Sequence, residues 1–214
     1  MATRRPYHHG QLERAAIDAA LDEVRAVGVA AVSMRRIARS AGVTHAALAY
    51  QFGDKAGIFT AVAAEGFRLM AAAITPAATG PQGFLFGGQS YVRFALSHPA
   101  HFEVMFRPGL YRSDDPELAS AKDAAFALLF DTARTDLTAQ RGTDVTDDEV
   151  RGVAMAGWSL SHGLATLMLN ANITNGPDPT DATFALHLAQ GLVTLGELTK
   201  EQLEALSKLN LPQH

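Results

Sequence analysis

Side chains that can recognise double-stranded DNA are concentrated between residues 35 and 55 of the sequence. Imidazole and carboxamide groups can hydrogen-bond to base edges, and methyl groups can contact thymine. Hydroxyl, ammonium and guanidinium groups bind backbone phosphates, as does a helix N-terminus. The candidates of these kinds are Arg35, Thr44, His45, Ala47, Ala49, Tyr50, Gln51 and Lys55. The alternative interpretation is an ordinary solvated face.

Aromatic and sulfur-containing side chains in the second part of the sequence could line a site for a small molecule. The candidates are Phe94, Phe102, Met105, Phe106, Phe126, Phe130, Trp158 and His162. His162 follows Trp158 by one helical turn, so both lie on one helix face and the imidazole could hydrogen-bond to a ligand. An apolar cavity with few polar groups is the usual form of such a site. Alternatively, these residues form a hydrophobic core in which Trp158 and His162 satisfy each other.

The sequence predicts no catalytic residue, no metal site and no cofactor. His98 and His101 lie three residues apart near Glu103 and could hold a metal, but a further ligand is missing and a surface pair is the preferred interpretation. Ser159 and His162 lie too close together on one helix to form a catalytic triad. Phosphate-binding glycine loops and nucleophile elbows are absent from the sequence. An all-helical enzyme or carrier with a merely structural helical hairpin is kept as an alternative.

The charge distribution is uneven along the 214 residues. Residues 1–58 contain eight Lys and Arg against five Asp and Glu, a net charge of +3, whereas the remainder contains ten against 17, a net charge of −7. A basic first part indicates a module that binds a polyanion, although random scatter of charge is an alternative. The hydrophobic fraction of 48% excludes a disordered polyelectrolyte, and the absence of cysteine excludes a disulfide scaffold.

Apolar residues recur at helical spacing throughout, which predicts an all-α protein. The expected helices span residues 11–27, 34–40, 44–52, 55–73, 84–97, 99–106, 116–140, 147–169 and 181–198, with loops at 75–83 and 107–115. The domains expected are residues 1–58 and 59–214, with a boundary inside the helix that begins at Lys55. Apolar runs long enough to span a bilayer and a signal peptide are not expected, so we expect a cytoplasmic protein.

Two short helices joined by Ala41-Gly42-Val43 predict a helix-turn-helix within residues 1–58. Gly42 can adopt the positive φ that such a turn requires. The second helix, residues 44–52, would be roughly 13 Å long and fits a major groove about 12 Å wide. The sequence therefore predicts that this segment is presented to DNA.

The helices at 147–169 and 181–198 are rich in small residues and leucine, which predicts a homodimer interface formed by four helices. A dimer would place two DNA-binding modules on half-sites about 34–36 Å apart, or one further turn. The alternative is that one of these helices is central in a monomeric core.

The stretch from Leu12 to Phe59 resembles the N-terminal domain of tetracycline-repressor (TetR) family regulators. The matching residues are Ile37-Ala38, Ala41-Gly42-Val43-Thr44, Leu48, Phe52, Lys55 and Ile58-Phe59. Ala46, Ala49 and Gln51 depart from the family pattern, which often has Gly or Pro, Tyr and His there. Trp158 to Gly163 resembles the Trp-x-x-x-His-Gly signature of one class of C-terminal TetR domains.

This resemblance implies an all-helical homodimer with an N-terminal helix-turn-helix domain and a C-terminal ligand-binding and dimerisation domain. It implies that the dimer binds palindromic operators and usually represses transcription until a small-molecule effector binds. A transcriptional activator is the alternative within the same class.

Overall fold

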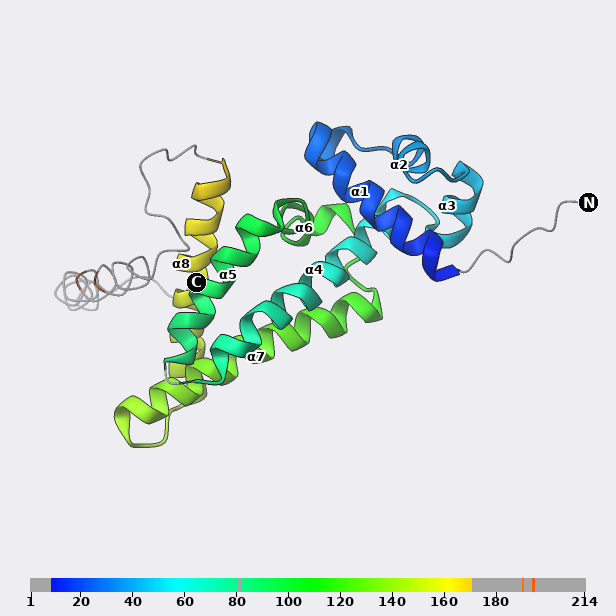
Figure 1. Cartoon of the computed structure of the whole chain (residues 1–214). Coiled ribbons are helices and arrows are strands. Elements are labelled where there is room, and N and C mark those ends of the chain that lie inside the picture. Colours follow the sequence, from blue (N-terminus) through cyan, green and yellow to red (C-terminus); the bar gives the residue numbers. More distant parts are fainter. Residues whose placement is uncertain (1–8, 81, 171–189, 191–193, 195–214) are drawn as a thin grey trace, which may run out of the picture. The chain divides into compact units, whose positions relative to one another are not determined.

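The computed structural model describes residues 9–80, 82–170, 190 and 194. Over these residues the chain is all-helical, which confirms the predicted fold class (Figure 1). The elements are α1 (His9–Ala31), α2 (Met34–Ser40), α3 (His45–Phe52), α4 (Lys55–Ala78), α5 (Gly83–Ser97), α6 (Pro99–Met105), the short 3₁₀ helix η1 (Pro108–Leu110), α7 (Pro116–Arg141) and α8 (Asp147–Asn170).

Helices α1 to α3 form a small helical unit whose turns are set by local side chains. Ser33 and Thr44 cap α2 and α3, since their hydroxyl oxygens accept from backbone N–H groups in the first turn. Gly42, in the turn between α2 and α3, has φ 66°, the left-handed conformation predicted for this position. Ile37 and Leu48 are fully buried, so α2 and α3 are held against α1 by one continuous core.

Helix α4 belongs both to this unit and to the helices that follow. Asp54 caps it, accepting from Gly57 N at 3.0 Å. The helix packs against α1 and also against α5, α6 and α7, so the predicted boundary at residue 58 lies within continuous helix. By length and composition α4 could cross a membrane, but 56% of its most apolar window is buried inside the protein. This is the behaviour of a central helix in a packed core.

Gly28 ends the first helical run of α1, as predicted, because its φ of 72° and ψ of 154° are not helical, and a second short run continues after this kink to Ala31. One helix end differs from the sequence prediction. Helix α4 includes Pro76 and ends at Ala78, not near residue 73. A proline so close to the end removes only one backbone hydrogen bond, and the carbonyl it leaves free belongs to the exposed residue Ala72, where water can reach it. The helix predicted at 181–198 lies outside the described residues apart from positions 190 and 194.

Small residues of α8 bring it close to α5. A Cβ atom on Gly157 would lie 2.6 Å from Phe84 Cε1, and one on Gly88 would lie 2.9 Å from Ser161 Oγ. Ala154 and Ala165 are fully buried within the protomer. Ala154, Gly157 and Ala165 lie on the helix at which the sequence predicts a dimer interface, yet they pack inside the chain.

Candidate DNA-binding surface and effector site

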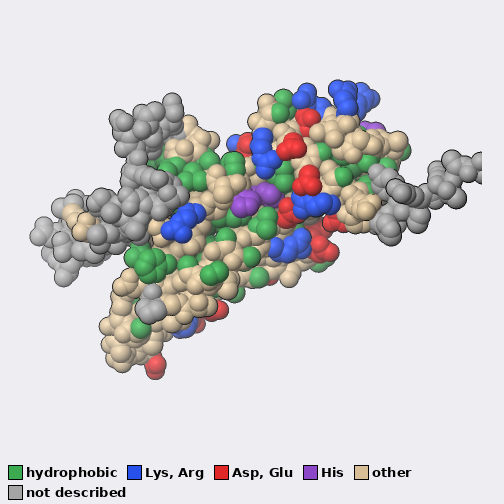
Figure 2. Space-filling view, in the orientation of Figure 1, with side chains coloured by type: hydrophobic (Ala, Val, Ile, Leu, Met, Phe, Trp, Pro, Cys, Tyr) green, Lys and Arg blue, Asp and Glu red, His purple; other side chains and the backbone are tan. Residues whose placement is uncertain are grey.

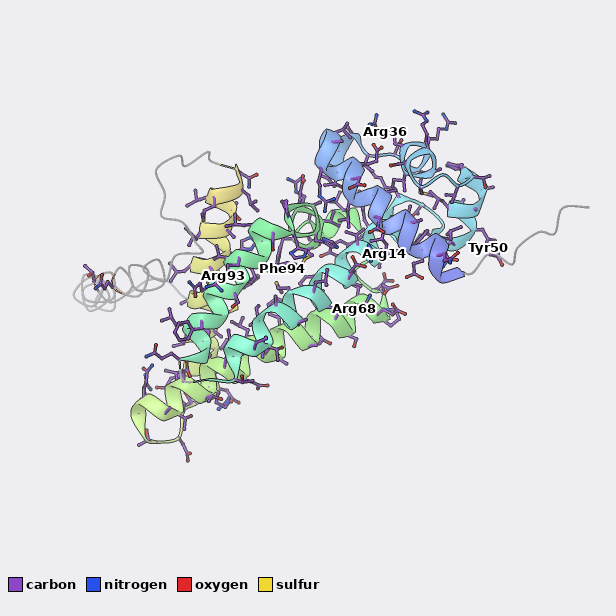
Figure 3. The ribbon with its side chains drawn as sticks, in the orientation of Figure 1. Arg14, Arg36, Tyr50, Arg68, Arg93 and Phe94 are labelled. Carbon is purple, nitrogen blue, oxygen red and sulfur yellow. The ribbon has the colours of Figure 1, made fainter. Side chains whose placement is uncertain are left out.

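Helix α3 presents its first turn and one later residue to solvent. Thr44, His45 and Tyr50 are exposed, and 87% of Tyr50 is accessible. Tyr50 points outward from α3 (Figure 3). Thr44 Oγ1 accepts from Ala47 N at 3.1 Å, which leaves the hydroxyl proton free to be donated to a phosphate. The geometry therefore offers one helix end and one phenol to an external ligand.

The other residues predicted on α3 are less accessible. Ala49 and Gln51 are half-buried, and Ala47 packs partly against the hydrophobic core. Ala46 is exposed instead, although the sequence analysis did not include it among the candidates. The burial of Leu48 and Phe52 could have located it, because positions 46 and 50 lie on the opposite side of the same helix.

Lys55 has a structural role in addition to its charge. Its Nζ donates to the carbonyl of Val32 at 3.2 Å and lies 5.6 Å from the centre of the Phe59 ring. The ammonium thus ties the start of α4 to the connection between α1 and α2. A lysine has three N–H donors, so two remain for a phosphate.

The arginines of α2 divide into two kinds. Arg36 is paired with Glu23 of α1 at 2.5 Å. Arg35 and Arg39 are exposed, and neither has a carboxylate partner among the described residues. In Figure 2, Lys and Arg side chains gather over α2. An uncompensated pair of guanidinium groups beside α3 attracts polyanions over several ångströms.

A cluster of aromatic rings is assembled from α5, α6, α7 and α8. It consists of Tyr91, Phe102, Phe106, Phe126, Trp158 and His162, which we call the aromatic cluster. The His162 ring lies 4.7 Å from Phe106 and 5.2 Å from Phe102, between ring centroids. The Trp158 ring lies 5.3 Å from Phe126. These contacts place five of the predicted effector-binding residues in one region.

Hydrogen bonds run in one direction through this cluster. Trp158 Nε1 lies 3.3 Å from Tyr91 Oη, which in turn lies 2.7 Å from His162 Nδ1. The indole can only donate, so the Tyr91 oxygen accepts from it and keeps its own proton available for Nδ1. In the tautomer in which Nδ1 accepts this proton, the neutral imidazole carries its own proton on Nε2. Burial lowers the pKa of His162 and raises the pKa of Tyr91, which favours the neutral form of both.

Three predicted effector-binding residues do not join the aromatic cluster through ring or hydrogen-bond contacts. Phe94 stacks on His98 at 4.7 Å and lines a surface depression of about 210 Å³ together with Arg93. Phe130 packs in a second hydrophobic cluster with Ala133 and neighbouring residues of α7 and α8. Met105 lies against Gly66 of α4. The helical periodicity of the sequence does not show that these three residues lie apart from the aromatic cluster, because that depends on how α5 to α8 cross.

His98 and His101 do not form the surface pair that the sequence suggested. His101 is buried, with 4% of its surface exposed, and its Nε2 lies 2.9 Å from Glu65 Oε1 on α4. His101 lies within α6 on its buried side, whereas His98 precedes Pro99 at the start of the helix and remains partly exposed. Among the described residues no group of His, Asp and Glu side chains could hold a metal ion.

Family comparisons agree with this architecture. Residues 16–62 match the family described as bacterial regulatory proteins, tetR family, and residues 86–190 match the tetracyclin repressor-like C-terminal domain. No curated protein sequence matches this chain closely enough to count as a relative.

Solved structures share the same fold. A protein of unknown function from Rhodococcus sp. RHA1 is 26% identical, with a TM-score of 0.70 over 88% of this chain and 96% of its own. A tetR-family regulatory protein from Rhodococcus RHA1 is 20% identical, with a TM-score of 0.64 over 84% of this chain and 93% of its own. The multidrug binding protein EbrR, solved with imidazole, is 19% identical, with a TM-score of 0.53 over 87% and 95%.

Both halves of the chain thus match the two domains of one family, and the described residues of both matched stretches are helical apart from short connections. The alternative of an enzyme with a structural hairpin is excluded by this match. The chain is a member of the tetracycline-repressor (TetR) family of DNA-binding transcriptional regulators.

Proposed function

We propose that this regulator is a homodimeric repressor that an apolar small molecule releases from a palindromic operator. The observation that carries the proposal is the exposed face of α3 beside the exposed Arg35 and Arg39 of α2. The buried residues of α1 to α3 belong to the same hydrophobic core as those of the helices that form the aromatic cluster. A repressor needs both a DNA-reading surface and a route by which a distant ligand alters it. We expect it to act in the cytoplasm.

In the DNA complex, α3 enters the major groove with its N-terminal turn leading. Thr44 and the backbone N–H groups of this turn contact a phosphate, and His45 contacts a base edge. Gln51 reaches a base from the following turn, and Tyr50 reaches a backbone phosphate. Arg35 adds attraction that does not depend on sequence.

The effector binds at the aromatic cluster. The rings supply apolar surface, and the Nε2–H of His162 is the polar group that orients a ligand with a hydrogen-bond acceptor. Trp158 and His162 are half-buried, so their rings can be reached with little rearrangement. The similarity in fold to a multidrug binding protein is consistent with an apolar effector.

The dimer forms through the outer face of α8. Met155, Leu160 and Leu167 are exposed at 40%, 37% and 51%, and Gly152 and Ala156 lie on the same side of the helix. Large apolar side chains interspersed with small residues permit a second helix to approach closely.

The proposal is tested by selecting duplexes from a random pool with the purified full-length protein. Fluorescence anisotropy at 150 mM salt then compares the selected duplex with a scrambled duplex of the same composition. We expect the selected duplex to contain an inverted repeat and to bind at least about 10³-fold more tightly. Equal affinity for the two duplexes would refute the proposal.

A reporter gene placed behind the selected sequence distinguishes the two directions of regulation. We expect higher expression when the regulator is deleted. Lower expression would instead identify an activator. Compounds from an apolar library that quench Trp158 are then added to the complex, and those that bind should raise its dissociation constant.

A further inference from the structure

A chain of polar contacts joins α1 of the DNA-binding unit to α6, one of the helices of the aromatic cluster. His101 on α6 lies 2.9 Å, through Nε2, from Glu65 Oε1 on α4. The same Glu65 carboxylate accepts from the guanidinium of Arg14 on α1, with one contact at 3.2 Å. Figure 1 shows α1, α4 and α6 meeting at one place, and Figure 3 shows Arg14 there.

The protonation states at this junction are set by the surroundings. Burial lowers the pKa of His101, so the imidazole is neutral and donates from Nε2 to the carboxylate. The hydrogen bonds from Arg14 and His101 outweigh the effect of burial and lower the pKa of Glu65. A carboxylate shared between α1 and α6 therefore remains charged in the neutral pH range.

Helix α6 is seated on α4 directly beside these groups. A Cβ atom added to Gly66 would lie 2.8 Å from Met105 Cγ and 3.3 Å from His101 Cβ. Glu65 and Gly66 are adjacent in α4. The contact of Glu65 with His101 and the close approach at Gly66 therefore fix the position of α6 along α4 together. Movement of α6 along α4 must change the geometry at Glu65.

Phe102 of α6 and Phe106, the residue that caps its C-terminus, supply two rings of the aromatic cluster. Phe102 follows His101 directly, and Phe106 follows one turn later, 5.0 Å from Phe102 between centroids. A ligand that displaces these rings displaces the helix that carries His101. Since packed cores change between discrete arrangements, a small displacement there can be transmitted as a change of register.

One polar atom at this junction is not satisfied. His101 Nδ1 is buried and has no hydrogen-bond partner among the described residues. A buried acceptor without a partner costs free energy. This cost makes the observed position of α6 on α4 less favourable than one in which Nδ1 had a partner.

We propose that Glu65 and His101 are positioning residues that transmit changes in the aromatic cluster through Arg14 to α1. Because α1 packs against α2, its orientation sets that of the DNA-reading helices. The inference rests on the proposed function, in that the aromatic cluster is taken as the effector site. It adds the residues that carry the coupling.

Coupling between two sites is reciprocal, so DNA can replace the unidentified effector as the probe. Trp158 is the only tryptophan of the chain and belongs to the aromatic cluster. Full-length protein is titrated with the selected duplex while Trp158 emission and its quenching by acrylamide are recorded. We expect DNA binding to shift both signals, although Trp158 lies far along the chain from α3.

The variants Arg14→Gln and Glu65→Gln each break the chain of contacts without changing α3. We expect each to bind the selected duplex while its Trp158 response falls by about half or more, and the double variant to show no additional loss. Glu117→Gln is the matched control, because it removes the contact of Glu117 with Arg68 on the same α4, at 3.9 Å, and leaves α1 untouched.

The outcomes separate the two proposals. Specific DNA binding by the wild-type protein without any change at Trp158 overturns the coupling and leaves the DNA-binding function intact. An unchanged Trp158 response in Arg14→Gln also overturns it. This variant guards against a folding defect in Glu65→Gln, since Arg14 is about half exposed at 47%. If no selected duplex is distinguished from a scrambled one, the proposed function itself fails.

Discussion

Lys55 illustrates how one side chain can serve both stability and binding. Its ammonium holds the Val32 carbonyl, and its charge lies at the start of α4 next to the end of α3. Gln51, by contrast, makes no side-chain hydrogen bond to another described residue. A cation without base contacts affects all DNA sequences alike, whereas a carboxamide at a base edge affects one base pair.

We therefore predict different signatures for Lys55→Ala and Gln51→Ala. The first should weaken binding to selected and scrambled duplexes by similar factors and lower the salt slope by about one. The second should cost about 1–3 kcal/mol of discrimination at one base pair. Anisotropy titrations against a set of single-base variants of the selected duplex measure both. A loss of discrimination in Lys55→Ala would contradict the assignment.

Tyr91 connects the two polar groups of the aromatic cluster, and its ring is buried. Tyr91→Phe keeps the ring but leaves Trp158 Nε1 and His162 Nδ1 without their partner. We expect the free energy of unfolding to fall by about 1–3 kcal/mol in urea titrations. Tyr50→Phe is the control, since Tyr50 is 87% exposed and should change stability by less than about 0.5 kcal/mol.

At the scale of elements, the contact between α4 and α6 depends on the absence of a side chain at Gly66. Gly66→Ala would place a methyl group against Met105 and should destabilise the protein by about 1–3 kcal/mol through overpacking. Gly152→Ala on α8 meets no atom within 4 Å and should be neutral or gain up to about 1 kcal/mol from helix propensity. Thermal unfolding followed by circular dichroism compares the two. Equal behaviour would contradict the close packing of α6 on α4.

The elements were predictable because their signals are local. Ser33, Thr44 and Asp54 each accept from an N–H group three residues away, so their capping roles can be inferred from the sequence alone. The capping box of Thr146 and Glu149 is present for the same reason.

Contacts between helices were not predictable in this way. His101 is a buried partner of Glu65 across 36 positions of sequence, and a period of 3.6 residues gives no information about such a pairing. Phe126 and Phe130 lie one turn apart on α7, yet only Phe126 contacts Trp158. The way α7 crosses α8 decides which of the two rings reaches Trp158, and the sequence of α7 alone does not specify this crossing.

For the whole molecule, the histidines predict how stability depends on pH. Burial lowers the pKa of both His101 and His162 in the folded protein. The unfolded chain then binds more protons below the ordinary histidine pKa of about 6.5, so stability is full above this pH and falls as the pH decreases through it. Carboxylates such as Glu65 have lowered pKa values in the folded protein, so their effect on stability appears only when the pH falls below the ordinary glutamate pKa.

Urea unfolding at pH 7.5 and at pH 5.5 isolates the histidine contribution. We expect a smaller free energy of unfolding at pH 5.5, and a smaller difference between the two conditions in His162→Gln than in the wild type. Stability that is equal at the two pH values, or greater at pH 5.5, would contradict the burial of neutral imidazoles.

The continuity of α4 has a practical consequence for hybrid regulators. A cut at residue 58 would disturb Phe59, Val62 and Phe67, which are all buried in the core. A chimaera that borrows the effector specificity of another family member should therefore keep α4 whole, and its junction should fall after Ala78. The incoming α6 would also need a residue that can face Glu65, since without one the transplanted sensor would bind its compound but leave the promoter unaffected.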